Sequence, residues 1–263
     1  MGSEDQTEDV GPGIAAATLI LFLEDGRGAA EHLMIQRTSQ MRFAPNALVF
    51  PGGRVDEDDI RVAGNDALVD VTLEDTMERA HRVTAIREML EEVGVIVGFS
   101  PLSALDVRAM QAALKSKTPF SSLLTEAGIK LDLSTIVPWA KWHPRFNSHR
   151  RFDTRFYIAR HQGDRALNAD VDEVGNARWM RANEAIAQAE AGTAKVIFPT
   201  LCNLERLAAY PEFERARAHL GDIACDPISP RLDKDDKGDD WICIPEDSGY
   251  PVTRRLVAAM QAP

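Results

Sequence analysis

The chain has 263 residues, of which 44% are hydrophobic and 27% charged, with a formal net charge of −11. This composition is ordinary for a globular protein, and the length suits one large domain or two small ones. The acidic balance excludes a general nucleic-acid binder, because no basic surplus is available to neutralise phosphates, but it allows a small phosphate-bearing ligand whose charge a metal ion offsets.

The first half of the chain predicts several strands and one long helix. Residues 1–12 are acidic and polar and predict a flexible tail. Apolar runs bounded by turn signals predict the first strands, the third of which ends in a Pro-Gly-Gly loop. Helical periodicity then begins near Asp75 and ends at Gly94. We therefore expect strands at 14–25, 31–37 and 47–53, a loop at 54–75, a helix at 75–93 and a strand at 93–98.

The second half predicts a mixture of strands and helices. Residues 101–128 predict one or two helices, broken at Lys117–Pro119. In 150–160, apolar and polar residues alternate as in a half-buried strand. The remaining expectations are strands at 134–144, 173–180 and 241–245, helices at 181–192 and 198–210, and a solvated loop at 233–240. Without regular βαβ alternation, the pattern indicates an α/β or α+β fold such as a layered α/β/α sandwich.

Cysteine usage and the chain ends bear on location. Cys202, Cys225 and Cys243 are far apart and show no zinc or disulfide spacing, which is typical of a reducing compartment. The N-terminus is unlike a signal peptide, and the longest apolar run, 14–23, is too short to span a bilayer. The final Gln-Ala-Pro is not a peroxisomal address. We expect a cytoplasmic protein with no membrane or nucleic-acid partner, and its oligomeric state stays open, a homodimer being one candidate.

Three glutamates in the stretch AIREMLEEVG share one face of the predicted helix. Glu88, Glu91 and Glu92 stand at i, i+3 and i+4, where like charges repel by a few tenths of a kcal/mol per pair. A solvated helix face is the ordinary explanation. The functional alternative is a cage for a hard divalent cation, which prefers oxygen ligands. Upstream, the glycine at 52 lets a backbone carbonyl approach such a site, and Arg87 can hold the loop against the helix by bidentate contact with a carboxylate.

A Gly-Gly loop followed by this helix resembles the Nudix box, G-x5-E-x7-R-E-U-x-E-E-x-G-U, where U is aliphatic. In the first half of the pattern, counting six positions from Gly53 gives Asp59 in place of glutamate. From Asp59 to Arg87 the chain runs 28 positions where the family has eight, so about 20 residues, approximately 60–79, are inserted. The second half is complete, with Arg87, Glu88, Met89, Glu91, Glu92, Gly94 and Val95.

The resemblance implies a Nudix α/β/α sandwich with a mixed sheet. It implies a single domain over 13–263, a box over 53–95, and elaborations in the insertion and at about 101–128. We expect the shorter acid at Asp59 to affect the orientation of the box and not its metal ligands. His81 could face the site, although an exposed helix histidine is the more ordinary expectation.

The resemblance also implies metal-dependent hydrolysis of a nucleoside diphosphate linked to another moiety. The implied metal ligands for Mg²⁺ or Mn²⁺ are Glu88, Glu91, Glu92 and Gly52, and the implied catalytic residues are Glu91, Glu92, Arg87 and Glu173. Glu173, in DVDEVGN, is the candidate base or extra ligand, and Asp170 and Asp172 compete for that role.

A narrower resemblance concerns the substrate. The segment LMIQRTSQMRFAPNALVFPGG is similar to the one that precedes the box in Nudix proteins that split coenzyme A and its esters. Arg37, Arg42 and the Phe-Pro-Gly-Gly match, whereas Thr38 and Asn46 depart from the motif. The insertion and the PW…RRFDTRF strand look like the acyl-coenzyme A diphosphatase branch. The implied substrate is therefore coenzyme A or an acyl-coenzyme A.

Basic and aromatic residues near 139–155 have two explanations each. The basic residues could bind phosphate, with Arg151 and Arg155 as substrate contacts beside Arg37 and Arg42, or they could offset nearby acids. This cluster consists of Lys141, Arg145, Arg150, Arg151 and Arg155. Trp139 and Trp142 could stack on an adenine, but core packing is the more ordinary role.

Three alternatives remain for the function. One is a pyrophosphatase for ADP-ribose, NADH or a nucleoside sugar. Another is a Nudix-fold sensor that binds a nucleotide without cleaving it, although degenerate boxes usually mark such proteins and REMLEEVG is intact. The third is a structural protein with an unrelated acidic helix, which would bind no divalent metal.

Overall fold

A computed structural model describes residues 13–26, 28–41, 44–70, 73, 75–100, 102–143, 151–169, 174–222 and 226–260. Several predictions fall outside these ranges: the tail at 1–12, the site candidates Arg42 and Glu173 with the alternatives Asp170 and Asp172, and the basic residues Arg145 and Arg150.

The central layer is a five-stranded mixed sheet. Strand β1 pairs in parallel with β6 and antiparallel with β4, and β5 pairs antiparallel with β6 and in parallel with β8. The mixed sheet expected from the sequence is therefore confirmed. Its order is β4 (Gly52–Arg54), β1 (Ile14–Phe22), β6 (Phe152–Arg160), β5 (Val137–Trp142) and β8 (Pro227–Ile228).

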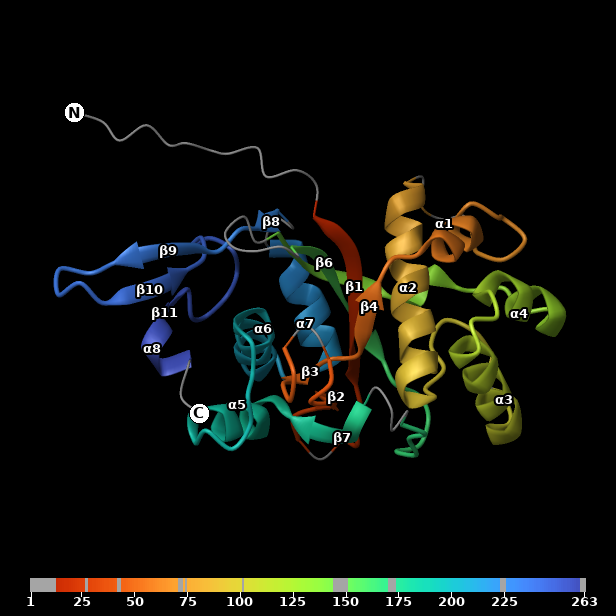
Figure 1. The fold of residues 1–263 in the computed structure, drawn as a ribbon, viewed down its shortest axis with the longest axis horizontal. Coiled ribbons are helices and arrows are strands. Elements are labelled where there is room, and N and C mark those ends of the chain that lie inside the picture. Colours follow the sequence, from red (N-terminus) through yellow and green to blue (C-terminus); the bar gives the residue numbers. More distant parts are fainter. Residues whose placement is uncertain are drawn as a thin grey trace.

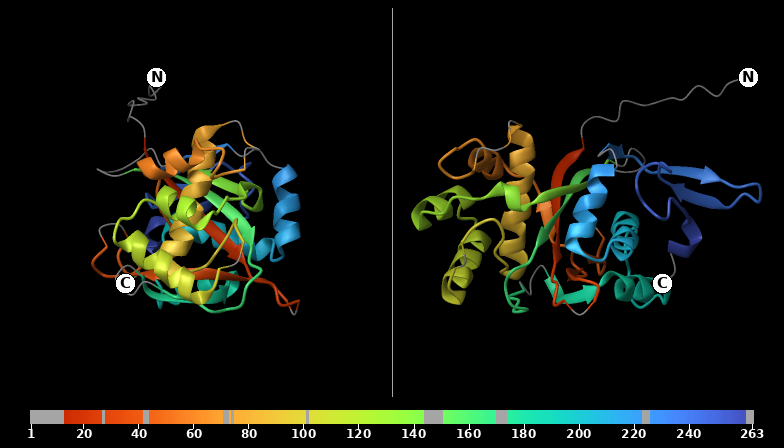
Figure 2. Two further views of the ribbon diagram at one scale, coloured as in Figure 1. Left: turned by 90° about the vertical axis from the view of Figure 1, so that its right-hand side faces the viewer. Right: turned by 180° about the vertical axis from the view of Figure 1, so that it is seen from behind.

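Helices α2 (Thr76–Val93) and α6 (Phe198–Ala209) cover opposite faces of this sheet, as Figures 1 and 2 show. Leu19 and Leu21 of β1 pack in the core on the α2 side, and Ile20 and Phe22 pack in the core on the α6 side. A strand with apolar residues on both faces is typical of burial between two layers. The α/β/α sandwich is thus confirmed.

Helix α2 begins and ends close to the predicted residues. Asp75 caps it by accepting a hydrogen bond from the backbone N–H of Met77 at 2.8 Å. Gly94 ends it with φ of 68°, a left-handed conformation that favours glycine, and donates its N–H to the carbonyl of Leu90. Almost every residue between Arg79 and Val93 is buried, because other elements surround the helix on several sides.

The loop expected at 54–75 is wrong in part, because it contains helix α1 (Glu57–Ala63). Asp56 caps α1 by accepting from the N–H groups of Asp58 and Asp59, a local hydrogen-bond pattern that stabilises a short acidic helix. Helices α3 (Ala104–Lys115) and α4 (Phe120–Ala127) break where predicted. Asp58 of α1 accepts hydrogen bonds from the N–H and hydroxyl of Ser121 in α4, so these elements pack together beyond α2.

The strand predicted at 93–98 is also wrong. Val93 is the last residue of α2, and residues 94–98 have no regular structure, although Val95 and Val97 are buried. Gly98 has φ of 77°, and its carbonyl accepts from the N–H of Asp132 instead of a neighbouring strand. The apolar run therefore fills the core without joining a sheet.

Two smaller antiparallel sheets complete the described fold. The first is β3-β2-β7, and the second, β11-β10-β9, lies at the far left in Figure 1. The predicted loop at 233–240 is mostly the turn of the β9–β10 hairpin. The remaining bounds are β2 (Glu31–Arg37), β3 (Leu48–Val49), β7 (Val174–Arg181), α5 (Ala182–Glu190), α7 (Phe213–His219), β9 (Arg231–Lys234), β10 (Asp240–Cys243), β11 (Arg254–Leu256) and α8 (Val257–Met260).

Both tryptophans of β5 belong to the core. Trp139 and Trp142 are each 1% exposed, and their indole N–H groups donate to Asn203 and to the Tyr250 hydroxyl respectively. Core packing is confirmed for both, so neither offers a free face to an adenine. In the part of the chain that the structure describes, no helix has the length and apolar character needed to cross a membrane.

Candidate active site

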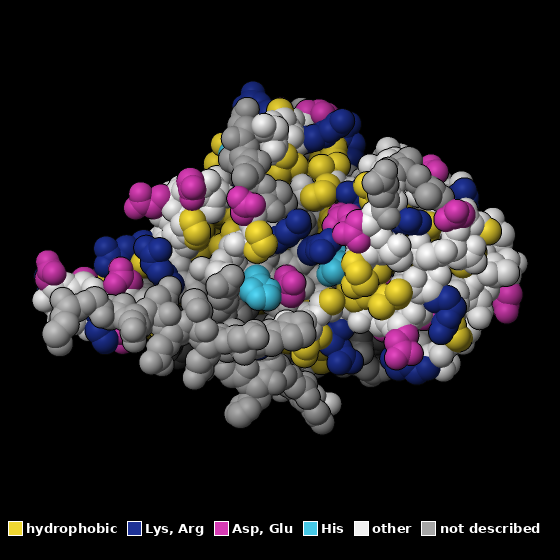
Figure 3. All heavy atoms as spheres, turned by 90° about the horizontal axis from the view of Figure 1, so that it is seen from above, with side chains coloured by type: hydrophobic (Ala, Val, Ile, Leu, Met, Phe, Trp, Pro, Cys, Tyr) yellow, Lys and Arg dark blue, Asp and Glu magenta, His cyan; other side chains and the backbone are white. Residues whose placement is uncertain are grey.

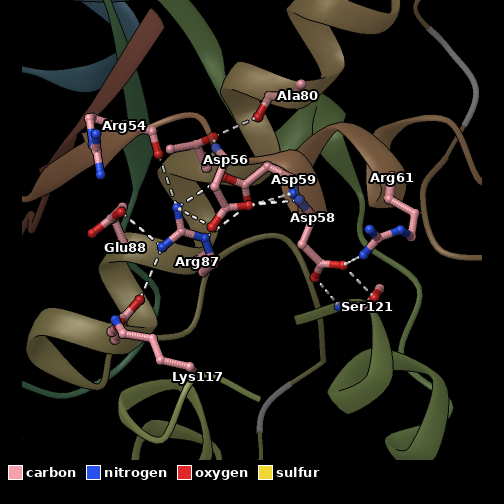
Figure 4. Close-up of polar contacts among 12 residues, drawn as sticks. Arg54, Asp56, Asp58, Asp59, Arg61, Ala80, Arg87, Glu88, Lys117 and Ser121 are labelled. Carbon is pink, nitrogen blue, oxygen red and sulfur yellow. Dashed lines mark hydrogen bonds and ion pairs between the residues drawn. The ribbon is translucent and has the colours of Figure 1, made fainter. Parts of the chain in front are cut away.

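Arg87 lies at the centre of the acidic face of α2 (Figure 4). Its Nε and Nη2 donate to the two carboxylate oxygens of Asp59 at 2.8 and 2.9 Å, a bidentate pair. Its Nη1 lies 2.8 Å from Oε1 of Glu88 and donates to Oε2 of Glu91 at 3.0 Å. Nη2 also donates to the carbonyl of Arg54 at 3.2 Å. One guanidinium therefore fixes three carboxylates and the end of strand β4.

Asp59 makes the contact that its short side chain and the long insertion had put in question. The side chain is fully buried, and besides Arg87 it accepts from the Thr84 hydroxyl at 2.8 Å and the backbone N–H of Asp56 at 3.1 Å. Helix α1 brings Asp59 close enough for an aspartate to replace a glutamate. The position of α1 thus lets the carboxylate of Asp59 reach Arg87.

The two glycines of β4 bring the backbone against the glutamates. A Cβ atom at Gly53 would overlap the carboxylate of Glu88, and one at Gly52 would overlap the backbone oxygen of Ala17 in β1. The N–H of Gly52 donates to Oε2 of Glu92 at 3.0 Å. Only glycine permits this approach of strand and helix. The Pro-Gly-Gly segment is therefore partly strand. Gly53 leaves room for the Glu88 carboxylate, and Gly52 leaves room for the backbone of β1.

Burial makes the negative charge of the site costly. It raises the pKa of the Glu88 carboxyl to about 7, and the neighbouring Glu91 and Asp59 act in the same direction, whereas Arg87 opposes them. For Arg87, burial alone would lower the pKa of the guanidinium, but Glu88 and Asp59 together raise it above its ordinary value. The site thus holds more carboxylates than the one buried cation can neutralise.

The donor set fits a divalent cation in its chemistry. The carboxylates of Asp59, Glu91 and Glu92 are buried and that of Glu88 is 14% exposed, and a hard cation prefers such oxygen ligands. Among the described residues, however, no three acidic, histidine or cysteine side chains converge into a ready-made metal cage. Mg²⁺ usually takes few protein carboxylates and completes its shell with waters and phosphates. Glu88, Glu91 and Glu92 would hold the ion with such additional ligands.

The predicted substrate contacts lie at separate places around the sheet. Arg37 ends β2 and pairs in register with Val174 of β7, directly after the undescribed segment that contains Glu173. Arg151 precedes β6, and its carbonyl accepts from the N–H of Ile14. Arg155 forms an ion pair with Glu78 near the start of α2. None of these contacts ties them to Glu88, so their role in binding substrate stays a prediction.

His81 is not the exposed helix histidine that was expected. It is 3% exposed, its Nδ1 contacts the carbonyl of Met77 at 2.6 Å, and burial lowers its pKa.

Seen from above in Figure 3, basic and acidic side chains are interspersed on the face shown, without one continuous basic surface.

Sequence reasoning missed several residues around the box. Lys117, with φ of 64° in the turn between α3 and α4, places its Nζ 4.0 Å from Oε1 of Glu91. Gln111 of α3 donates to the carbonyls of Glu91 and Asn168, which fastens the 161–169 segment to the end of α2. No local signal marks these residues, because they approach the box only through tertiary packing.

Comparisons with known proteins concern the sequence as a whole and the fold. No protein-family model matches the chain. The chain is 26% identical over 242 residues to "Putative nudix hydrolase 7" of Caenorhabditis elegans, which covers 90% of this chain and 74% of the relative. The crystal structure of a NUDIX hydrolase from Alicyclobacillus acidocaldarius matches with a TM-score of 0.67 and 28% identity, covering 80% of this chain and 97% of that chain.

A further crystal structure is less similar. The NUDIX domain of Shewanella oneidensis NrtR, in complex with ADP ribose, matches with a TM-score of 0.42 and 15% identity over 82% of this chain and 94% of that chain. At this level its ligand says nothing about the substrate here. The chain is thus similar to Nudix hydrolases over most of its length, and this similarity together with the sandwich fold supports a pyrophosphohydrolase.

Proposed function

We propose that the chain is a divalent-metal-dependent hydrolase that cleaves the pyrophosphate of coenzyme A or an acyl-coenzyme A. The observation that carries the chemistry is the cluster around Arg87, in which Asp59, Glu88 and Glu91 share one buried guanidinium. Such a surplus of carboxylates favours a cation as the missing partner.

The side chains have distinct roles in this proposal. Glu88, Glu91 and Glu92 hold Mg²⁺ or Mn²⁺, with the Gly52 carbonyl as a further ligand. Once bound, the ion lowers the pKa of a water and offsets the charge of the pyrophosphate. Arg87 keeps Glu88 and Glu91 in place, and Asp59 holds Arg87 by two hydrogen bonds. Glu173 is the proposed base that takes the proton from the attacking water.

Coenzyme A is proposed as the substrate because of its extra phosphate. It carries a 3′-phosphate that ADP-ribose lacks, and Arg37, Arg42, Arg151 and Arg155 are the proposed contacts for its phosphates. A charge-assisted hydrogen bond from arginine contributes roughly 1.5–3 kcal/mol, which is about ten- to a hundredfold in preference. The products are adenosine 3′,5′-bisphosphate and a phosphopantetheine compound.

The test is turnover of coenzyme A, acetyl-coenzyme A, 3′-dephospho-coenzyme A, ADP-ribose, NADH and a nucleoside sugar, with and without Mg²⁺ or Mn²⁺. We expect kcat/KM for coenzyme A to exceed that for 3′-dephospho-coenzyme A by about tenfold or more. Arg37→Gln should reduce this preference, whereas Arg108→Gln, which changes an exposed arginine of α3, should leave it unchanged.

The outcomes separate the parts of the proposal. Equal kcat/KM for the two coenzyme A forms would remove the role of the arginines. A clear preference for ADP-ribose would remove coenzyme A as the substrate and leave the pyrophosphohydrolase chemistry. Binding of these compounds without product, in the presence of either metal, would instead indicate a nucleotide sensor.

A further inference from the structure

A cavity of about 260 Å³ lies between the C-terminal sheet and the connection from α5 to α6. Apolar side chains form much of its lining, namely Val196, Leu201, Trp241 and Val252. In Figures 1 and 2 the β9–β11 sheet and α2 lie on opposite sides of the central sheet. The cavity is therefore separate from the Nudix box.

Positive charge is concentrated at this cavity in an otherwise acidic chain. Lys195, Arg254 and Arg255 line it, and Glu190 is the one acid among its lining residues. Arg255 also forms an ion pair with Glu205 of α6, whose side chain is 8% exposed. Asp235 lies outside the lining but accepts a hydrogen bond from the Trp241 indole N–H and interacts electrostatically with Arg254, so cations exceed acids only among the residues that line the cavity. An acidic protein gains nothing in solubility from such a cluster, which favours an anionic ligand.

The two arginines of the cavity have different surroundings. The guanidinium of Arg254 lies over the ring of Trp241, at 4.3 Å from its centroid, which holds a long side chain at the edge of the cavity. The Nε atom of Arg255 is buried and has no hydrogen-bond partner. A buried donor without a partner costs free energy. Oε2 of Glu205, the ion-pair partner of Arg255, also lacks a hydrogen bond, so either this oxygen or an anion in the cavity can satisfy Nε.

We propose that this cavity binds a small organic anion, with its charged group between Lys195, Arg254 and Arg255 and its apolar body against Leu201 and Trp241. Guanidinium groups donate hydrogen bonds to phosphate and to carboxylate alike, so either group can lie beside the cationic residues of the cavity. The volume is below the approximately 300–1,000 Å³ typical of sites for drug-sized ligands, which suits a ligand much smaller than coenzyme A.

The test is isothermal titration of the metal-free full chain with phenyl phosphate and benzoate, compared with inorganic phosphate and benzyl alcohol. Metal is omitted because the carboxylates of the box then repel anions. We expect phenyl phosphate or benzoate to bind at least about tenfold more tightly than inorganic phosphate and benzyl alcohol, since only they use both parts of the cavity. The tighter of the two organic anions identifies the preferred charged group.

Single substitutions locate the binding site. Lys195→Gln and Arg254→Gln should each weaken binding by about three- to tenfold. Lys195 is exposed, so its variant tests the proposal even if changes at the arginines disturb folding. The matched control is Lys234→Gln, a cation of the same small sheet that pairs with Asp240 outside the cavity lining. Its affinity should equal that of the wild type.

Glu92→Gln in the Nudix box should leave the affinity for the organic anions unchanged. The test of this cavity is therefore independent of the test of the proposed hydrolase. No saturable binding of either organic anion would overturn the proposal. Equal affinity in the wild type and in Lys195→Gln and Arg254→Gln would do so as well, and loss of binding in Glu92→Gln would assign the anion to the box.

Discussion

The two halves of helix α2 carry opposite charge arrangements. In the first half, the single carboxylate of Glu78 accepts hydrogen bonds from Arg82 and the Tyr157 hydroxyl and pairs with Arg155. Arg82 donates further to the backbone carbonyls of Leu133 and Ile136. Both oxygens of Glu78 have partners within the protein, and the contacts fasten the start of α2 to β6 and to the chain before β5.

In the second half, the proportions are reversed, because Arg87 is shared by Asp59, Glu88 and Glu91. The same helix therefore has one acid, Glu78, that pairs with two arginines and, about two turns later, one arginine that pairs with four acids, since Asp56 also lies 3.7 Å from Arg87. In the first arrangement the excess charge is positive, and Arg82 also donates to backbone carbonyls. The second leaves negative charge unmatched in a buried place, which is costly for folding and useful only if a cation binds.

The largest effect expected from this difference concerns Glu92. Its Oε2 accepts from the Gly52 N–H, a contact that the amide oxygen of glutamine can preserve, so Glu92→Gln should remove charge without loss of the fold. We expect turnover to fall by a thousandfold or more, which is at least about 4 kcal/mol of transition-state stabilisation. Glu57→Gln, at an exposed acid of α1, is the control. Wild-type turnover of a folded Glu92→Gln protein with Mg²⁺ would refute the assignment.

The second effect concerns stability. Asp59→Ala leaves Arg87 without its bidentate partner and should lower the free energy of unfolding by about 4 kcal/mol, as expected for one member of a buried ion pair. Asp66→Ala is the matched control, since its carboxylate is exposed and lies 3.7 Å from Arg79. A change below about 0.5 kcal/mol is expected there. Urea unfolding measures the free energy of unfolding of both variants. Equal losses in Asp59→Ala and Asp66→Ala would show that the ion pair of Asp59 adds no more stability than an exposed one.

A third effect is the pH dependence of the metal-free protein. The pKa of Glu88 is raised from 4.5 to about 7, chiefly by burial, so the folded state holds a proton that the unfolded state releases. Its contribution is fully present below about pH 4.5 and is lost as the pH rises through about 7. We expect a loss of up to about 3 kcal/mol between these limits. Unfolding in chelator should show it, and Glu88→Gln should abolish it. An unchanged pH profile in that variant would assign the effect to another group.

The second half of α2, which carries the box, could be predicted from the sequence far better than the first half. Glu88, Glu91 and Glu92 follow a short, regular spacing on one helix, so their common face could be derived without a structure. The ion pair between Arg155 and Glu78 joins residues 77 positions apart. Sequence spacing contains no sign of it. Arg155 was predicted to bind substrate from its charge and from the resemblance of its strand, and that role stays a prediction.

The errors in the fold have a related cause. Helix α1 was missed because seven residues show too little periodicity, and its stability comes from the Asp56 cap and from contacts with α4. Val95 and Val97 were predicted to lie in a strand because they are apolar, although apolar residues fill a core equally well without one. Local patterns therefore predicted long elements, whereas short ones depended on tertiary contacts.

The smallest effect concerns Lys117, the one lysine that the described contacts bring near the box. Its side chain is 83% exposed, and its Nζ lies 4.0 Å from Glu91, so the pair itself adds little to stability. A mobile cation beside an acidic site can still meet a substrate phosphate. We expect Lys117→Gln to raise KM by about two- to fivefold with kcat unchanged, because an exposed charge contact contributes 1 kcal/mol at most. Lys130→Gln, an exposed lysine beyond α4, should change neither constant. A tenfold fall in kcat would make Lys117 a catalytic residue. An unchanged KM would show that Lys117 does not contact the substrate.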